Sequence, residues 1–229
     1  MERKLSTVFA LDVVGFSKLM AEDEARTLDN LKKRREFIDT IIEEYEGRIF
    51  NTAGDSVLAE FASPVRAAEC AVQIQNRSQA MNIMSEDSDK MSFRVGINVG
   101  DVMISDENLF GDAVNIAARL EAQALVDGIC ISQSTFDMVN LKVKVSYEDA
   151  GELELKNIGR PIKAYNILKC KGATRNVTSS QDTPMTKVDE VEPGSVAVML
   201  FKNLSNDDEQ EYFCEGFSED LISALSRYK

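Results

Sequence analysis

Two carboxylates in this sequence stand out because of their surroundings. Asp12 interrupts an apolar run over residues 7–14, and Asp55 completes a tight Gly-Asp turn between two short β-type runs. A carboxylate inside a buried strand is costly unless a cation, an Arg, a Lys or a helix amino terminus lies beside it. Each residue also has a structural alternative. Asp55 would then be a solvated turn residue, and Asp12 a partner of the first turn of the next helix.

Taken together, the two carboxylates predict a site for divalent cations. Pairing of neighbouring strands would bring Asp12 and Asp55 within reach of the same ions. Two acidic groups and a triphosphate can hold two Mg²⁺ or Mn²⁺ ions about 3.5–4 Å apart, an arrangement used for in-line phosphoryl chemistry. Arg94, Arg119 and Lys156 would then be available to neutralise phosphate oxygens.

Asn115 and Arg119 form a second polar pair, on a helix predicted over residues 112–124. Residues four apart on a helix project from one face, one turn from each other. Such a pair could present an amide and a guanidinium to a single ligand. The alternative is a structural pair on a helix surface.

Composition excludes several kinds of chemistry. The 229 residues include no histidine, which removes Ser-His-Asp and Cys-His catalysis and every His-ligated metal site. The net charge of −13, from 39 acidic and 26 basic residues, argues against a nucleic-acid partner, which would need a basic face. A small phosphorylated ligand stays possible where cations or a few Arg and Lys residues supply positive charge.

Cysteine usage and hydropathy predict a cytoplasmic chain. The four cysteines, Cys70, Cys130, Cys170 and Cys214, show no CxxC spacing, which is typical of reduced thiols. No apolar run approaches the ~20 residues that a membrane-spanning helix needs. The amino terminus lacks the cleavage site of a secretory signal.

The order of elements predicts an α/β (α+β) fold with a mostly antiparallel sheet and helices packed on it. Gly96 and Gly100 indicate bends or a close backbone approach within a strand. Strands are expected over residues 7–14, 48–51, 56–61, 92–104, 128–132, 152–155 and 162–168, a turn over 106–110, and helices from 17 to a stop at Gly47 and over 64–81, 112–124 and 133–139.

Three regions are expected along the chain. A catalytic domain takes residues 1–171, and a linker rich in Ser, Thr, Asp and Glu takes residues 172–194. Residues 195–229 contain one predicted strand and one predicted helix, too few to bury a core. They are therefore interpreted as the truncated start of a second domain.

Four segments in this order resemble the catalytic domain of class III nucleotidyl (adenylate/guanylate) cyclases: ALDVVGFSKL, NTAGDSVLAEF, FRVGINVGDV and GDAVNIAARLE. The likeness runs from about Thr7 to Leu168. It implies a ferredoxin-like palm core and a head-to-tail homodimer with active sites at its interface. The last 35 or so residues resemble the opening of a TolB-like module.

The resemblance also implies a role for each candidate residue. Asp12 and Asp55, with the backbone carbonyl of Val13, would bind two divalent cations, and Asn115 and Arg119 of the other subunit would act on the ribose and the transition state. The terminal phosphates would meet Val14, Gly15, Phe16, Ser17, Arg94 and Lys156.

The base-reading positions depart from the family patterns. This chain has Asn51 and Asn108 at the two positions that read the base. Adenylyl cyclases of the family usually have Lys and Asp at these positions. Guanylyl cyclases commonly have Glu and a Cys or similar residue there. An amide can donate and accept, so either purine could be satisfied. ATP is favoured over GTP because guanine suits a carboxylate acceptor that is missing here. The 101–111 segment is also shorter than the dimerisation arm of many relatives.

The expected activity is conversion of ATP to 3′,5′-cyclic AMP and pyrophosphate. Three alternatives stay open: a guanylate cyclase, a degenerate cyclase-like module that binds a nucleotide or a partner without turnover, and a diguanylate cyclase. The last is disfavoured because NTAGDS stands where its GGDEF-type hairpin would be.

Overall fold

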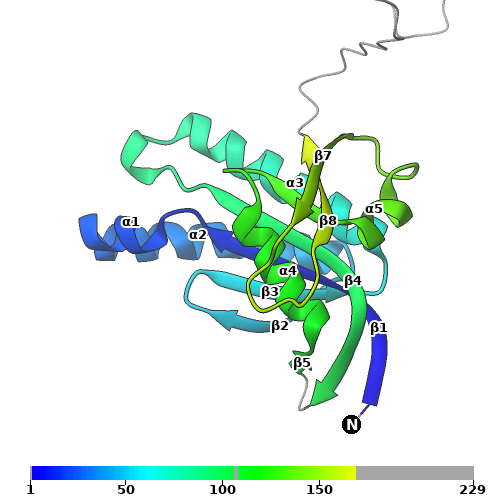
Figure 1. The fold of residues 1–229 in the computed structure, drawn as a ribbon. Coiled ribbons are helices and arrows are strands. Elements are labelled where there is room, and N and C mark those ends of the chain that lie inside the picture. Colours follow the sequence, from blue (N-terminus) through cyan, green and yellow to red (C-terminus); the bar gives the residue numbers. More distant parts are fainter. Residues whose placement is uncertain (1, 106–107, 169–229) are drawn as a thin grey trace, which may run out of the picture. The chain divides into compact units, whose positions relative to one another are not determined.

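The structure is a computed structural model, and it describes residues 2–105 and 108–168. This part of the chain contains both strands and helices, mixed along the sequence (Figure 1). Its elements are β1 (Glu2–Val13), α1 (Phe16–Glu22), α2 (Glu24–Glu44), β2 (Arg48–Ala53), β3 (Ser56–Phe61), α3 (Pro64–Met84), η1 (Asp87–Asp89), β4 (Phe93–Ser105), β5 (Asn108–Phe110), α4 (Asp112–Gln123), β6 (Ile129–Ser132), α5 (Gln133–Val139), β7 (Ser146–Leu153) and β8 (Ile162–Leu168).

The described strands form one eight-stranded sheet. Its order is β2-β3-β1-β4-β6-β8-β7, with β5 paired to the end of β4. Only the β4–β6 pairing is parallel among these strands, and the others are antiparallel. The predicted mixed α/β fold with a mostly antiparallel sheet is therefore confirmed.

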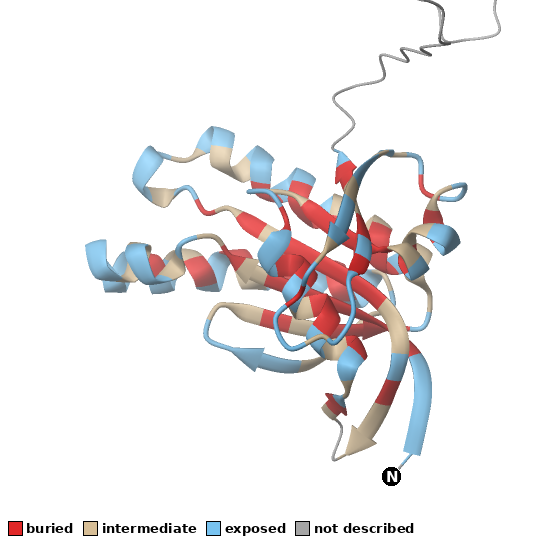
Figure 2. Cartoon of the chain, viewed as in Figure 1, coloured by how far each residue is buried: buried red, intermediate tan, exposed pale blue. Residues whose placement is uncertain are grey.

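Side-chain alternation along the central strands separates two apolar layers. On β1, Phe9, Leu11 and Val13 belong to the large core under α2, α3 and α5, whereas Val8 and Ala10 pack toward α4. Figure 2 shows this buried material along the middle of the sheet. Because alternate residues share a face, Asp12 lies on the α4 side of β1.

Two glycines let α4 lie directly on β4. A Cβ atom at Gly96 would stand 2.1 Å from the Ala117 carbonyl oxygen and 2.2 Å from the Glu121 nitrogen, and one at Gly100 would stand 2.8 Å from the Ala113 Cβ. Real Cβ atoms do not approach other atoms so closely, so only glycine fits at Gly96 without movement of the helix. The predicted close backbone approach is confirmed.

The helix expected from residue 17 to Gly47 is wrong as a single element. Asp23 adopts an extended conformation, with φ −157° and ψ 98°, and separates α1 from α2. Its side chain accepts a hydrogen bond from the Arg26 N–H, so it caps α2 in the manner of a helix N-cap. The amphipathic spacing continues across the break, which explains why the pattern alone suggests one helix.

Two segments expected to be irregular contain regular structure. Residues 108–110 were expected to lie in a turn. They form the strand β5 because they pair with the end of the long strand β4. The polar segment after residue 81 continues α3 to Met84 and then contains the short 3₁₀ helix η1. The proposed linker and second domain, including the TolB-like likeness, lie outside the described residues.

Candidate active site

The two carboxylates meet where β1 ends. Asp12 is opposite Arg94 in the antiparallel β1–β4 pairing and is half-buried. Gly54, at φ 63°, turns the β2–β3 hairpin so that the Asp55 carboxylate accepts a hydrogen bond from the Val13 N–H at 3.3 Å. Burial, followed by the charge and hydrogen bonding of Asp55, raises the pKa of Asp12 to about 6, and Arg94 opposes this shift.

This donor set fits a divalent cation bound together with phosphate. Two carboxylates and a backbone carbonyl are the hard oxygen donors that Mg²⁺ and Mn²⁺ prefer. Burial and then the charge of Asp55 both disfavour the ionised form of Asp12, as its raised pKa shows, and a bound cation would relieve this cost. Across residues 2–105 and 108–168, no cluster of three or more acidic or cysteine side chains could enclose a metal alone. Ligand oxygens would have to complete the coordination.

Arg94 lies at the centre of the surrounding contacts. Its Nη2 is 4.0 Å from the Asp12 Oδ2, its Nε is 3.1 Å from the Glu121 Oε1, and its Nη1 donates to the Ala122 carbonyl at 3.3 Å. Burial raises the pKa of the Glu121 carboxyl to about 7; the charges of Asp12 and Asp55 add to this effect, and Arg94 opposes it. Glu121 was not among the site residues predicted from the sequence.

The turn after β1 adjoins the carboxylates. The Val14 N–H donates to the Ser92 carbonyl at 2.9 Å, and Gly15 adopts a left-handed conformation with φ 70° before α1 begins at Phe16. No side chain caps this helix start. Residues 14–17 therefore follow Asp12 and Val13 directly, and they include the start of a helix, where the first backbone N–H groups have no partner within the helix.

Asn51 and Asn108 lie together at the sheet edge. They line a cavity of about 390 Å³ with Ile49, Phe50 and Thr52. A register shift between Ile49 and Asn51 in the β2–β3 pairing marks an irregularity beside this cavity. Asn108 belongs to β5, so a segment that was predicted to be a turn is a strand that helps to form the cavity.

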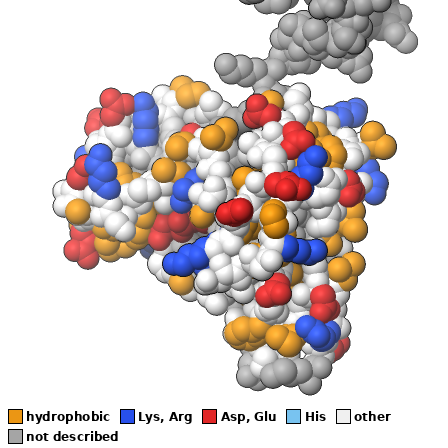
Figure 3. Space-filling model, in the orientation of Figure 1, with side chains coloured by type: hydrophobic (Ala, Val, Ile, Leu, Met, Phe, Trp, Pro, Cys, Tyr) orange, Lys and Arg blue, Asp and Glu red, His pale blue; other side chains and the backbone are white. Residues whose placement is uncertain are grey.

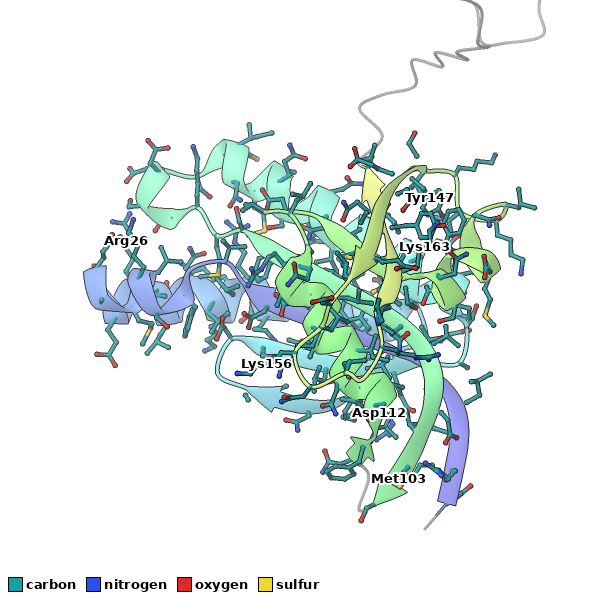
Figure 4. All side chains as sticks on the ribbon, viewed as in Figure 1. Arg26, Met103, Asp112, Tyr147, Lys156 and Lys163 are labelled. Atoms are coloured by element: carbon teal, nitrogen blue, oxygen red, sulfur yellow. The ribbon has the colours of Figure 1, made fainter. Side chains whose placement is uncertain are left out.

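The remaining candidates lie apart from the carboxylates. Asn115 and Arg119 are exposed on α4, whose buried face rests on the sheet. In the part of the chain that the structure describes, no hydrogen bond or ion pair joins them to Asp12 or Asp55. Lys156 is exposed on the loop between β7 and β8, beside α4 (Figure 4). The neighbouring Leu155 is buried against α4 and anchors this loop.

Basic side chains are scattered over the molecular face in Figure 3. They stand among acidic ones and form no continuous basic band on that face. Within the described ranges, no helix is both long and apolar enough to cross a lipid bilayer.

Comparison with known proteins identifies the family. The family described as "Adenylate and Guanylate cyclase catalytic domain" matches residues 2–169. The chain therefore belongs to this family, which confirms the class III nucleotidyl cyclase resemblance. The palm fold of these cyclases agrees with the mixed sheet and its helices.

A relative and two solved structures illustrate the likeness. A Rhizobium meliloti (strain 1021) protein described as "Putative adenylate cyclase 3" is 38% identical over 226 residues, which cover 98% of this chain and 38% of that protein. The "Adenylate/Guanylate Cyclase/Hydrolase" structure from Silicibacter pomeroyi is 37% identical with a TM-score of 0.69, covering 73% of this chain and 98% of that one. The guanylate cyclase domain from Catenaria anguillulae in complex with GTP is 24% identical with a TM-score of 0.62, covering 74% and 99%, and shares the fold.

Proposed function

We propose that this chain contains the catalytic domain of an adenylate cyclase that converts ATP to 3′,5′-cyclic AMP and pyrophosphate. The observation that carries the proposal is the meeting of Asp12 and Asp55 beside Arg94 at the end of β1, in a chain of the cyclase family. The four residues Asp12, Asp55, Asn115 and Arg119 together argue against a degenerate module, because binding alone would not need all of them.

In the proposed reaction the ribose 3′-oxygen bonds to the α-phosphorus of the same nucleotide. The bond from that phosphorus to the bridging oxygen breaks, and pyrophosphate leaves with the electron pair. Bound divalent cations would lower the pKa of the 3′-hydroxyl, whose proton passes to water, and would place positive charge beside the triphosphate, so no histidine base is required. Asp12, Asp55 and the Val13 carbonyl would hold these cations.

The other side chains would position the nucleotide and meet its charge. Arg94, Lys156 and the 14–17 turn would bind the terminal phosphates. Asn115 would orient the ribose, and Arg119 would donate to the α-phosphate oxygens as charge builds on them. Removing one preorganised donor of this kind costs about 3–4 kcal/mol of transition-state stabilisation.

The separation of these groups supports a shared site. Asn115 and Arg119 are exposed on α4, and no described interaction joins them to the carboxylates of their own chain. We propose a head-to-tail homodimer in which α4 of one chain faces the Asp12–Asp55 pair of the other. Such a two-fold arrangement gives two equivalent sites, each built from both chains.

The Asn51–Asn108 cavity supports ATP as the purine nucleotide, with GTP as the second candidate. Each amide can both donate and accept, which suits the amino group and ring nitrogen of adenine. Guanine presents an N1–H and an exocyclic amine, which would be better matched by a carboxylate. The same amide flexibility keeps GTP as a candidate, so each nucleotide should be assayed separately.

A subunit-mixing experiment tests the proposal. Asp55→Ala and Arg119→Ala should each abolish formation of cyclic nucleotide from ATP or GTP with Mn²⁺, assayed by chromatography, while both variants stay dimeric by light scattering. Mixed in equal amounts, they should recover about a quarter of the wild-type activity, because half of the dimers are mixed and each holds one intact site.

The exposed Asp29 provides a matched control for the loss of a carboxylate. Asp29→Asn should keep full activity, because its pairing with Lys33 is solvent-exposed and contributes little. Near-normal turnover by Asp55→Ala would refute the metal assignment. Absence of recovery in mixed dimers would refute the shared site.

A further inference from the structure

Glu121 and Asp12 both lie within ion-pair distance of the Arg94 guanidinium, Glu121 at the closer range. Glu121 approaches the Nε at 3.1 Å, and Asp12 approaches the Nη2 at 4.0 Å. The third contact is the hydrogen bond from Nη1 to the Ala122 carbonyl. Two of the three contacts therefore come from the end of α4. The longest of the three is the contact with Asp12, a proposed cation ligand.

The position of Glu121 is fixed by backbone packing. Gly96 is two residues beyond Arg94 on β4, so both residues face α4. Only the missing side chain of Gly96 allows the Glu121 nitrogen to lie where it does. The Glu121 carboxylate is thereby held over the same strand, within ion-pair distance of Arg94.

The Arg94–Glu121 contact is largely buried and depends on charge. The exposed side-chain fractions are 27% for Arg94 and 11% for Glu121. Neither the Arg94 Nε nor the Glu121 Oε1 has an aligned hydrogen-bond partner among the described residues. Removing one partner of such a buried pair leaves the other uncompensated, so the remaining group must find a new partner.

Asp12 is the nearest alternative partner for Arg94. An Arg–carboxylate pair can close into two parallel hydrogen bonds, which is a strong geometry. Asp12 would then be neutralised by Arg94 and would compete poorly for a divalent cation. Arg94 itself would be drawn away from incoming phosphate oxygens.

We propose that Glu121 is a positioning residue that holds Arg94 away from Asp12, so that Asp12 stays available to a divalent cation and Arg94 to the phosphates. This inference rests on the cation-binding role proposed above for Asp12 and Asp55. It assigns to α4 a function in its own chain's site, in addition to the role proposed for its exposed face in the partner's site.

Direct binding of Mn²⁺ tests this assignment without turnover. The full chain would be titrated with Mn²⁺ in the presence of 3′-deoxy-ATP, which lacks the attacking hydroxyl, and free Mn²⁺ measured by electron paramagnetic resonance. Glu121→Gln should weaken Mn²⁺ binding about tenfold, as is typical when a residue that orients a metal ligand is lost. Glu121→Asp, which keeps the charge, should lose less. The exposed Glu152 of β7 gives a matched control, and Glu152→Gln should bind as wild type.

An Arg94→Met background separates positioning from direct attraction of the cation. If Glu121 acts through Arg94, adding Glu121→Gln to Arg94→Met should leave Mn²⁺ affinity unchanged. An equal loss in both backgrounds would overturn the inference, as would wild-type affinity in the single Glu121→Gln variant. Should Glu121→Gln fail to fold, Glu121→Asp takes its place. Its effect on Mn²⁺ affinity is then compared in the wild-type and Arg94→Met backgrounds.

Failure of the proposed function has a different signature. Asp55→Asn should itself weaken Mn²⁺ binding. If Asp55→Asn binds Mn²⁺ as wild type does, or if the wild type binds none, the cation site is refuted and the role of Glu121 with it. If Asp55→Asn weakens binding and Glu121→Gln does not, only the positioning role is refuted.

Discussion

Replacement of Gly96 by Ala tests the contact on which the candidate site depends. The new Cβ would lie 2.1 Å from the Ala117 carbonyl oxygen and 2.2 Å from the Glu121 nitrogen. Both atoms belong to the α4 backbone, so no side-chain rotation can relieve the overlap. Ordinary contact begins at 3.4 Å, so the helix or the strand must shift by about 1.3 Å.

Such a shift should affect stability and activity together. Overpacking of a well-packed interface typically costs 1–3 kcal/mol, and backbone overlap at Gly96 places it at about 3 kcal/mol. For a domain of this size, that corresponds to a fall in melting temperature of about 6–12 °C. Displacement of α4 by about 1 Å would move Glu121 and Arg119 from their positions, and misplacement of this size can cost about 100-fold in rate.

Thermal unfolding followed by circular dichroism, with the cyclase assay at a temperature where the variant is folded, would measure both effects. Gly100→Ala overlaps the Ala113 Cβ, at 2.8 Å, and its other neighbours lie at ordinary contact distances of 3.6 and 3.7 Å, so this variant should be milder. Gly159→Ala has no atom within 4 Å of the new Cβ and should melt as wild type does. A Gly96→Ala protein with wild-type melting and turnover would refute the close packing of α4 on β4.

Two further predictions concern polar residues on and beside the β2–β3 hairpin. Glu60 is a buried carboxylate that pairs with Lys4 and Arg48, and these bonds hold its pKa below the ordinary 4.5 although burial opposes them. Its ionised form therefore stabilises the fold above that pH, so Glu60→Gln should cost about 2–3 kcal/mol at pH 7. This difference should shrink as the pH falls below 4.5 in urea titrations, and a constant difference would contradict the argument. Replacing Asn51 by Lys and Asn108 by Asp should raise the ATP-to-GTP ratio of kcat/KM at least about tenfold; an unchanged ratio would show that this cavity does not read the base.

Most strands were predictable, with the exceptions of β5 and of β7, which runs over Ser146–Leu153 where a strand over residues 152–155 was expected. The faces that the strands present were not predictable. Both faces of β1 are covered, so its sequence is an apolar run without alternation, and nothing in the pattern tells which layer Asp12 joins. The pairing of Asp12 with Arg94 depends on register, which is a property of two distant segments. The hairpin that brings in Asp55 was predictable because a Gly-Asp turn is a local signal.

The helical periodicity of α4 contains a signal for Glu121. The buried residues of α4 are Ala113, Ile116, Ala117, Leu120 and Glu121, a continuous inward stripe at helical spacing. An acidic residue on such a stripe calls for a cationic partner. The identity of that partner, Arg94, could not be read from spacing, because it comes from another element.

The break at Asp23 and the strand β5 illustrate two other limits. A helix interruption without Gly or Pro leaves the apolar period intact, and only the capping chemistry of Asp23 marks it. β5 is three residues long and exists because β4 continues beside it. Short strands of this kind are set by their partner more than by their own propensity.

The position of β2 at the edge of the sheet bears on how this domain could change over evolutionary time. Asn51 is exposed on that edge, whereas Asp12 lies one residue before the end of the central strand β1, between buried neighbours. Exposed edge positions tolerate exchange at little cost in stability, while core positions do not. If the Asn51–Asn108 cavity reads the base, nucleotide preference can change through substitutions that cost the fold little, while Asp12, between the buried Leu11 and Val13, lies in a strand whose packing tolerates less change.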